Sequence, residues 1–252
     1  MSTHRRHRPL LHRPYFGLSA GLALLGITVL LILGVGSQTG VTAPDTAFPP
    51  IGALDQATYD VVQQIRNPVF GFIARVLNFL GGGLFNIPFR ALALVVLLFV
   101  LRRYRHAIAF AITWALSEAL MTGLKIAIDR MRPPDPLVVT HGTSFPSGHS
   151  VAGATIGISL VISFLPAGHR RRVWEWMAGA FAFLMGLSRV YLNAHWLSDA
   201  TAGVFLGAGV ALTVAALVAL VDRRIEGETP ADEIDPEDPE RSPADSVPVE
   251  PA

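Results

Sequence analysis

The chain has 252 residues, of which 51% are hydrophobic and only 15% are charged, and it contains no cysteine. This composition is typical of a membrane protein rather than a soluble domain, and the absence of cysteine excludes disulfides and thiolate metal sites. The net charge of +1 conceals an asymmetry, because residues 222–252 hold eleven acidic side chains against three arginines. The rest of the chain is therefore strongly basic.

Six apolar stretches are long enough, or nearly long enough, to cross a membrane as helices. A helix rises about 1.5 Å per residue, so roughly 20 apolar residues cross a hydrocarbon core of about 30 Å. The stretches are residues 16–36, 84–101, 107–128, 151–165, 173–187 and 200–221. The sequence therefore predicts an all-α integral membrane bundle of six transmembrane helices.

The first two stretches each carry a complication. Residues 16–36 follow a basic start and precede small residues near Ala43, as in a secretory signal peptide. The apolar run is longer than a usual signal core, which favours a membrane anchor. The second stretch contains Pro88 and Arg90, and we expect the long side chain of Arg90 to reach the membrane interface.

Four short basic clusters fall on one side of this bundle. They are "RRHRPLLHR" before the first span, "RRYRH" at 102–106, "GHRRR" at 168–172 and "DRR" at 222–224. The positive-inside rule places that side, and with it both termini, in the cytoplasm. We therefore expect a plasma-membrane or inner-membrane protein whose other face is extracytoplasmic.

Three regions follow from this arrangement. Residues 1–15 form a basic cytoplasmic N-terminus, and residues 16–221 form the six-span domain. Within that domain, residues 54–80 mix polar and apolar side chains at helical spacing, which predicts an extracytoplasmic interfacial helix. Residues 222–252 are acidic, rich in proline and poor in large apolar side chains, so we expect a disordered cytoplasmic tail. The sequence contains no nucleotide-binding loop or nucleic-acid module.

The first polar group on the predicted outer face is "KIAIDRMRP". Lys125 and Arg132 are seven residues apart, so they would share a face if the helix extended that far. Pro133 disfavours a helical Arg132, which we expect where the chain leaves the membrane. Taken alone, this pair also fits a positive flank that anchors the end of a span.

The second group is "SFPSGHS", in which Ser147 precedes a long apolar run and is expected to cap a helix. The free N–H groups and the dipole at such an end favour an anion. Gly148 permits close approach, and His149 can exchange a proton with a bound group. Simple capping beside a surface histidine is the alternative for this stretch.

The third group is "SRVYLNAHWLSD". His195 and Asp199 are four residues apart, so the carboxylate can bind one ring nitrogen and leave the other free. Arg189 can join them only if the helix turns in between, and Asn193 is a suitable place for a turn. The alternative is an interfacial belt with a charge pair.

Together the three groups supply three cations, one helix N-terminus and two histidines. This set suits a multiply charged anion held beside a nucleophile and an acid. Phosphoryl transfer is the matching reaction, because it depends mostly on charge stabilisation and positioning.

The three segments resemble the type 2 phosphatidic acid phosphatase (PAP2) family of membrane lipid phosphatases. The family pattern is Lys, six residues, Arg-Pro; then Pro-Ser-Gly-His; then Ser-Arg, five residues, His, three residues, Asp. This chain matches every fixed position and every internal gap with "KIAIDRMRP", "PSGH" and "SRVYLNAHWLSD". The resemblance covers residues 125–199 directly, and the six-span plan extends it to about residue 221.

The resemblance implies that three cations hold the phosphate oxygens, with help from the Ser147 hydroxyl and the Gly148 N–H. These cations are Lys125, Arg132 and Arg189. The implied substrates are lipid phosphates and diphosphates in the outer leaflet, namely phosphatidate, phosphatidylglycerophosphate or polyprenyl diphosphates. The scheme needs no metal and no cofactor.

The resemblance also assigns the reacting groups. His195 would attack phosphorus to form a phosphohistidine, and Asp199 would orient it. His149 would protonate the leaving oxygen and then activate water. Beyond the family pattern, we expect Glu118, an acid in the middle of a span, to face the bundle interior and support Lys125. The alternative is that Glu118 is protonated or has its partners within the helix bundle and plays no part in catalysis.

Two other functions remain open at this point. Ser147 could be the nucleophile of a membrane acyl hydrolase, although the Gly-x-Ser-x-Gly elbow is missing and three cations would be superfluous. The chain could instead be a non-catalytic binder or transporter of phosphate lipids. A broken catalytic position would indicate such a protein, and none of the positions is broken.

Overall fold

The computed structural model describes residues 10–11, 13–35, 49–166 and 168–226. These residues form eight α-helices and one π-helical segment, without a strand. The elements are α1 (Pro14–Val35), α2 (Pro49–Ile65), α3 (Pro68–Gly81), α4 (Gly83–Val95), η2 (Val96–Val100), α5 (Tyr104–Ile128), α6 (Gly148–Phe164), α7 (His169–Tyr191) and α8 (Leu197–Glu226). The all-α prediction is thus confirmed for the described residues.

Each predicted span corresponds to a helical segment, but the spans are not alike. Four segments are long and apolar enough to cross a membrane: Pro14–Val35, Gly83–Val100, Tyr104–Ile128 and Leu197–Ile225. By contrast, α6 has only 17 residues and α7 begins with the polar run "HRRR". An integral membrane protein is therefore supported, while the six-span arrangement stays a prediction.

The two predicted terminal regions lie largely beyond the part of the chain that the structure describes. The basic N-terminus up to residue 9 and the tail beyond Glu226 lie outside the described residues. α8 continues without a break past the predicted boundary at residue 221, to Glu226, and the regions themselves stay a prediction.

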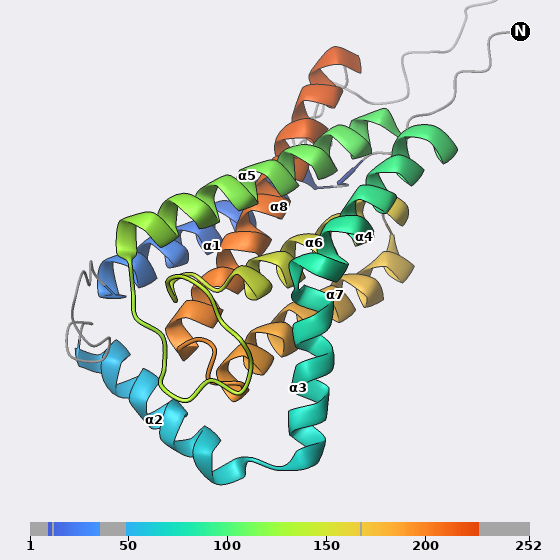
Figure 1. The fold of residues 1–252 in the computed structure, drawn as a ribbon. Helices are drawn as coiled ribbons and strands as arrows, with labels where there is room; N and C mark the ends of the chain where they lie inside the picture. The colour runs from blue at the N-terminus through green and yellow to red at the C-terminus, as the bar shows by residue number, and fades with distance from the viewer. Residues whose placement is uncertain (1–9, 12, 36–48, 167, 227–252) are drawn as a thin grey trace, which may run out of the picture.

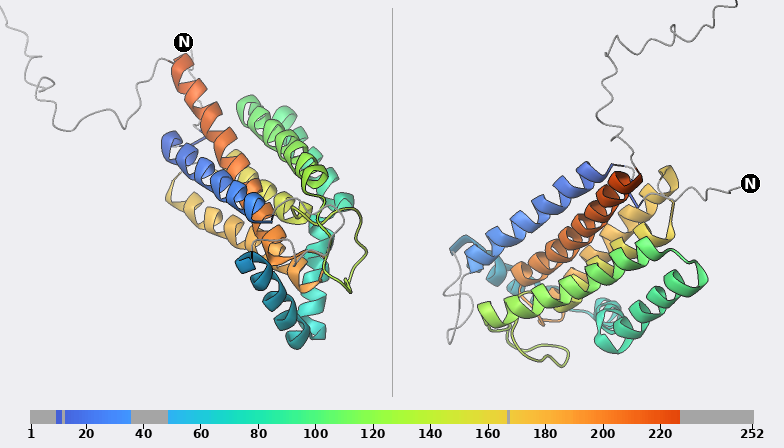
Figure 2. Two further views of the ribbon diagram at one scale, coloured as in Figure 1. Left: turned by 90° about the vertical axis from the view of Figure 1, so that its left-hand side faces the viewer. Right: turned by 90° about the horizontal axis from the view of Figure 1, so that it is seen from above.

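The bundle is built around α8, which packs against α1, α5, α6 and α7. Figure 2 shows α1 and α8 running side by side. Glycines make the closest contacts possible: a Cβ on Gly203 would lie 2.6 Å from the Ser147 carbonyl oxygen, and one on Gly207 would lie 2.6 Å from that of Val151. Small residues four apart let membrane helices approach in this way. The contact fixes the start of α6 against α8.

The single interfacial helix predicted at 54–80 is instead two helices. The Asn67 side chain caps α3 by accepting from the Phe70 N–H, and Pro68 is the first residue of α3. Proline has no N–H to continue the preceding helix, which explains the break. Figure 1 shows α2 and α3 meeting at the bottom of the view, with α3 then running up into α4. α3 packs on α7, so it belongs to the bundle.

Arg90 and Glu118 form a pair that the sequence analysis did not identify, and the contact favours the alternative given there, in which Glu118 is satisfied within the bundle. Arg90 does not reach the interface but is 1% exposed, and its Nη1 lies 2.9 Å from Glu118 Oε1. Its Nη2 donates to Thr155 Oγ1 at 2.9 Å, and the guanidinium lies over the Trp114 ring. Glu118 is 45% exposed and its carboxylate binds Arg90 rather than Lys125. A cation within an apolar bundle needs a carboxylate partner, and Glu118 supplies it.

Candidate active site

The predicted site residues gather at one end of the bundle. Figure 1 shows the yellow-green loop between α5 and α6 folding across the lower ends of α7 and α8. That loop, residues 129–147, lies against the turn between α7 and α8, where the Leu137 N–H donates to the Leu192 carbonyl. Asn193 adopts a left-handed conformation with φ 50° in that turn, as predicted.

His195 lies in the turn and is 3% exposed. Its Nε2 is 3.1 Å from Arg132 Nη1, and its Nδ1 is 3.4 Å from Ser144 Oγ and 3.7 Å from Asp199 Oδ2. A guanidinium can only donate, so Nε2 must be the nitrogen with the lone pair and Nδ1 must carry the proton. The geometry therefore leaves the Nε2 lone pair facing the Arg132 guanidinium.

Burial keeps this imidazole neutral. Desolvation, against the opposing effect of Asp199 and with the help of Arg132 and Arg189, lowers the pKa of His195 to about 4. A neutral imidazole is the form that can attack an electrophile. With this pKa, the His195 ring carries no charge near neutral pH.

Asp199 is fully buried and held by several donors. Its Oδ2 accepts from Ser144 Oγ at 2.5 Å and from the Trp196 N–H at 2.9 Å, and its Oδ1 accepts from Arg130 Nη1 at 2.6 Å. These bonds fix the carboxylate on the Nδ1 side of His195. They are shorter than the 3.7 Å that separates the carboxylate from the ring.

Arg130 and Asp55 extend this network and were missed by the sequence analysis. Arg130 is 0% exposed and its Nη2 donates to Asp55 Oδ2 at 2.7 Å. Asp55, on α2, also accepts from the Ser198 N–H at 2.9 Å. Burial alone would lower the pKa of Arg130, but the two carboxylates raise it above its usual value. Arg130 lies inside "DRMRP", yet no pattern in the sequence pairs it with an acid 75 residues earlier.

Lys125 and Arg132 converge, although not through a shared helical face. α5 ends at Ile128, where Asp129 is left-handed, so the helix does not reach Arg132. Lys125 Nζ donates to the Thr143 carbonyl at 2.8 Å, and Arg132 Nη2 donates to the same oxygen at 3.0 Å. Arg132 also donates to the Ala194 carbonyl at 2.6 Å, beside His195. The loop thus brings both cations to one point.

Arg189 comes from the last turn of α7 and is 3% exposed. One guanidinium nitrogen donates to the Asn78 side-chain oxygen of α3, which the sequence analysis did not identify. Its Nε is buried without a hydrogen-bond partner among the described residues. A buried charged donor without a partner is costly, so a bound anion would stabilise this group.

Ser147, Gly148 and His149 form the start of α6. Ser147 is the N-cap, as predicted, with its Oγ accepting from the Ser150 N–H. The Ser147 N–H donates to the Asp199 carbonyl at 3.1 Å, which ties the helix start to α8. His149 Nε2 lies 3.1 Å from the Asn78 carbonyl, so Nε2 is the protonated nitrogen. Within the described residues no cluster of three His, Cys, Asp or Glu side chains could hold a metal ion.

Comparison with known proteins identifies related chains. The PAP2 superfamily profile matches residues 106–223. Phosphatidylglycerophosphatase B of Bacillus subtilis (strain 168) is 30% identical over 167 residues, which cover 62% of this chain and 79% of the relative. An undecaprenyl-diphosphatase of Sulfolobus acidocaldarius is 29% identical over 45% of this chain and 56% of its own length.

A solved structure matches the fold. The crystal structure of a transmembrane PAP2 type phosphatidylglycerolphosphate phosphatase from Bacillus subtilis superposes with a TM-score of 0.65 at 25% identity. The match covers 82% of this chain and 97% of that one. The chain therefore shares the fold of a known membrane phosphatase over most of its length.

Proposed function

The chain belongs to the PAP2 superfamily, and from this premise we propose that it removes phosphate from lipid phosphates or diphosphates within the membrane. Its relatives act as phosphatases on phosphatidylglycerophosphate and undecaprenyl diphosphate, by their names. One observation carries the proposal: a buried, neutral His195 presents Nε2 to Arg132 beside Arg189, whose Nε has no partner. Phosphatidylglycerophosphate, phosphatidate and polyprenyl diphosphate are the candidate substrates.

The nucleophilic step begins at His195. Its Nε2 attacks phosphorus, and the bond from phosphorus to the lipid oxygen breaks as the new N–P bond forms. The Nδ1 proton stays toward Asp199 and Ser144, where the carboxylate stabilises the positive charge that develops on the ring. His149 gives its proton to the leaving oxygen. In the second step His149 accepts a proton from water as the water oxygen attacks phosphorus. The N–P bond to His195 breaks at the same time, which releases phosphate and returns His195 to its neutral form.

The cations stabilise the charge on the phosphoryl oxygens. Arg189 offers its unpartnered Nε, while Lys125 and Arg132 now hold the Thr143 carbonyl and lie close enough to reach a shared anion. The Ser147 hydroxyl and the Gly148 N–H, at the positive end of α6, would complete the set. Fixed donors of this kind supply the largest part of catalysis in phosphoryl transfer.

The test is to purify the full chain in detergent and measure phosphate release from the three candidate lipids. Label from a phosphate substrate should be trapped as acid-labile phosphohistidine, and His195→Ala should abolish both the label and turnover. Retained label in Ser147→Ala excludes a serine nucleophile, whereas acid-stable label in the wild type that is lost in Ser147→Ala with His195 intact would favour a serine-dependent hydrolase. Full biological activity of His195→Ala would instead favour a non-catalytic phosphate-lipid binder.

A further inference from the structure

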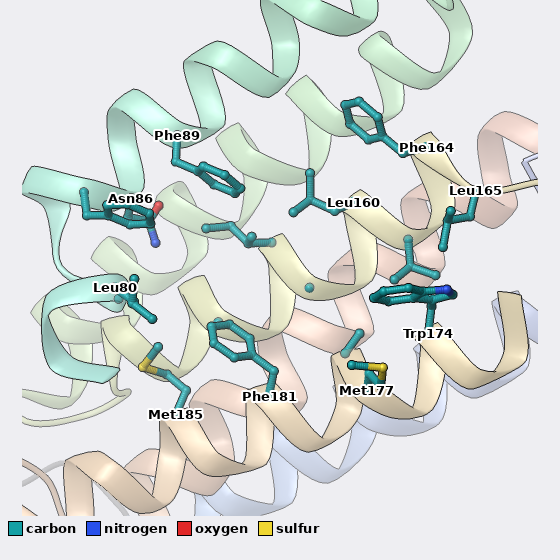
Figure 3. A pocket seen from close by; sticks show the side chains of 17 residues that line it. Leu80, Asn86, Phe89, Leu160, Phe164, Leu165, Trp174, Met177, Phe181 and Met185 are labelled. Atoms are coloured by element: carbon teal, nitrogen blue, oxygen red, sulfur yellow. The ribbon is translucent and has the colours of Figure 1, made fainter. Parts of the chain in front are cut away.

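An apolar groove of about 450 Å³ lies between α4, α6 and α7. None of the 17 residues that line it is charged, and Asn86 is the one side-chain amide among them. Figure 3 shows Leu80, Asn86 and Met185 at one end and Phe164, Leu165 and Trp174 at the other. The volume is in the usual range of about 300–1,000 Å³ for a small-molecule site.

The Leu80 end of the groove lies next to the candidate active site. A Cβ on Gly81 would lie 2.8 Å from His149 Cδ2 and 2.9 Å from Met185 Sδ, and both Gly81 and Met185 line the groove. The ring of His149 thus lies directly beside Gly81 at this end of the groove, although His149 is not one of the lining residues. Because His149 is the group that would protonate the leaving oxygen, we expect the part of the substrate that leaves to extend into the adjacent groove.

The groove has the depth of one lipid chain. Along α6 its lining runs from Gly153 to Leu165, and at about 1.5 Å per residue these twelve steps span roughly 18 Å. One leaflet of a hydrocarbon core of about 30 Å is roughly 15 Å deep. A single hydrocarbon chain of a lipid in one leaflet would therefore fill the groove.

Asn86 makes the groove selective. Its side chain is 4% exposed, and its Nδ2 is buried without a hydrogen-bond partner among the described residues. The Asn86 N–H bonds to the Gly82 carbonyl, so Asn86 lies one helical turn, about 5.4 Å, beyond the junction that contacts His149. A buried amide donor in an apolar wall is costly unless the occupant supplies an acceptor.

The position of this donor distinguishes two classes of lipid. In a glycerophospholipid the ester carbonyl of an acyl chain is only a few bonds from the phosphate, whereas a polyprenyl chain has no oxygen beyond its phosphates. Resting on the proposed function, we propose that the groove binds one acyl chain of a glycerophospholipid phosphate and that Asn86 Nδ2 donates a hydrogen bond to its ester carbonyl. Asn86 is then a specificity-determining residue that favours acyl-ester lipids over polyprenyl diphosphates.

The experiment compares diacyl phosphatidate with its dialkyl ether analogue of equal chain length, in mixed micelles with the purified full chain. The ether lacks only the carbonyls. We expect kcat/KM to be about five- to tenfold higher for the ester, which is the contribution of one neutral hydrogen bond. Asn86→Leu should remove this preference by lowering the ester rate alone, and it should leave polyprenyl diphosphate hydrolysis unchanged.

The matched control is Phe89→Leu, which alters the same groove wall without touching a polar group. It should lower the ester and ether rates by the same factor. Equal ester and ether rates in the wild type would overturn the proposal even if Asn86→Leu did not fold, as would an Asn86→Leu loss confined to polyprenyl diphosphate. If phosphohistidine is trapped but the ester and ether lipids react at equal rates, only the role of Asn86 is refuted. If no lipid phosphate is turned over, the proposed function is refuted as well.

Discussion

The state of His195 depends on its burial as much as on its partners. The ring is 3% exposed, and desolvation lowers its pKa from 6.5 to about 4. A lowered histidine pKa means that the unfolded chain binds more protons than the folded protein between these two values. The buried His195 therefore lowers the free energy of unfolding as the pH falls from about 6.5 toward 4. Above pH 6.5 it has no such effect.

This difference can be measured by thermal unfolding of the wild type and His195→Gln between pH 7 and pH 5. Glutamine keeps a polar side chain but cannot titrate, so the difference between the two proteins isolates His195. We expect the wild type to lose about 2 kcal/mol relative to the variant at pH 5. Parallel pH profiles for the two proteins would show that His195 titrates normally.

Arg130 is a positioning residue, because it holds Asp199 without touching the proposed site of phosphorus. Arg130→Gln leaves the carboxylates of Asp55 and Asp199 buried without their cation, which costs about 3–5 kcal/mol of stability. A small displacement of Asp199 should also lower kcat about 100-fold with little change in KM. The measurement is kcat and KM per folded molecule, with Arg130→Lys expected to recover part of kcat.

The control for Arg130 is Arg171→Gln. Arg171 is equally buried, and it binds Glu175 and the Leu10 carbonyl near the start of α7. This variant should lose stability but keep kcat per folded molecule. If both variants lowered kcat alike, Arg130 would have only a structural role.

At the scale of the helices, caps and turns could be predicted from the sequence better than the ion pairs that join different helices. The Ser147 cap and the Asn193 turn depend on neighbouring residues, and both were predicted. The Arg130–Asp55 and Arg90–Glu118 pairs join different helices, and no spacing rule within one helix reveals them. The gathering of the three motifs was predicted from their common place on the outer face of the bundle, and the family resemblance added the role of each residue.

The contact between α6 and α8 gives a prediction at the same scale. Because a Cβ at Gly203 would lie 2.6 Å from the Ser147 carbonyl oxygen, Gly203→Ala must displace the start of α6. Overpacking of this kind costs about 1–3 kcal/mol, and it should lower phosphatase activity because Ser147, Gly148 and His149 move together. The measurements are the melting temperature and phosphate release.

Gly179→Ala is the matched control, because nothing lies within 4 Å of a Cβ at that position of α7. Alanine is the better helix former by about 1 kcal/mol, so this variant should be as stable as the wild type or more stable, with full activity. Similar losses in the two variants would mean that close packing at Gly203 is not what positions the site.

At the scale of the whole molecule, we propose that the site faces away from the cytoplasm. The 17 residues of α6 span about 26 Å, nearly the thickness of a hydrocarbon core. The site loop and the basic cluster at 168–172 therefore lie at opposite ends of this helix, and the positive-inside rule assigns the basic end to the cytoplasm. Phosphate would then be released outside.

The absence of cysteine makes this orientation directly testable, because the wild type gives no background with a thiol reagent. Val139, in the site loop, is 83% exposed, and Arg172, near the start of α7, is also exposed. A membrane-impermeant maleimide should label Val139→Cys on intact cells, and Arg172→Cys only after permeabilisation. The reverse pattern would place the site in the cytoplasm, where the outer leaflet could not supply its substrate.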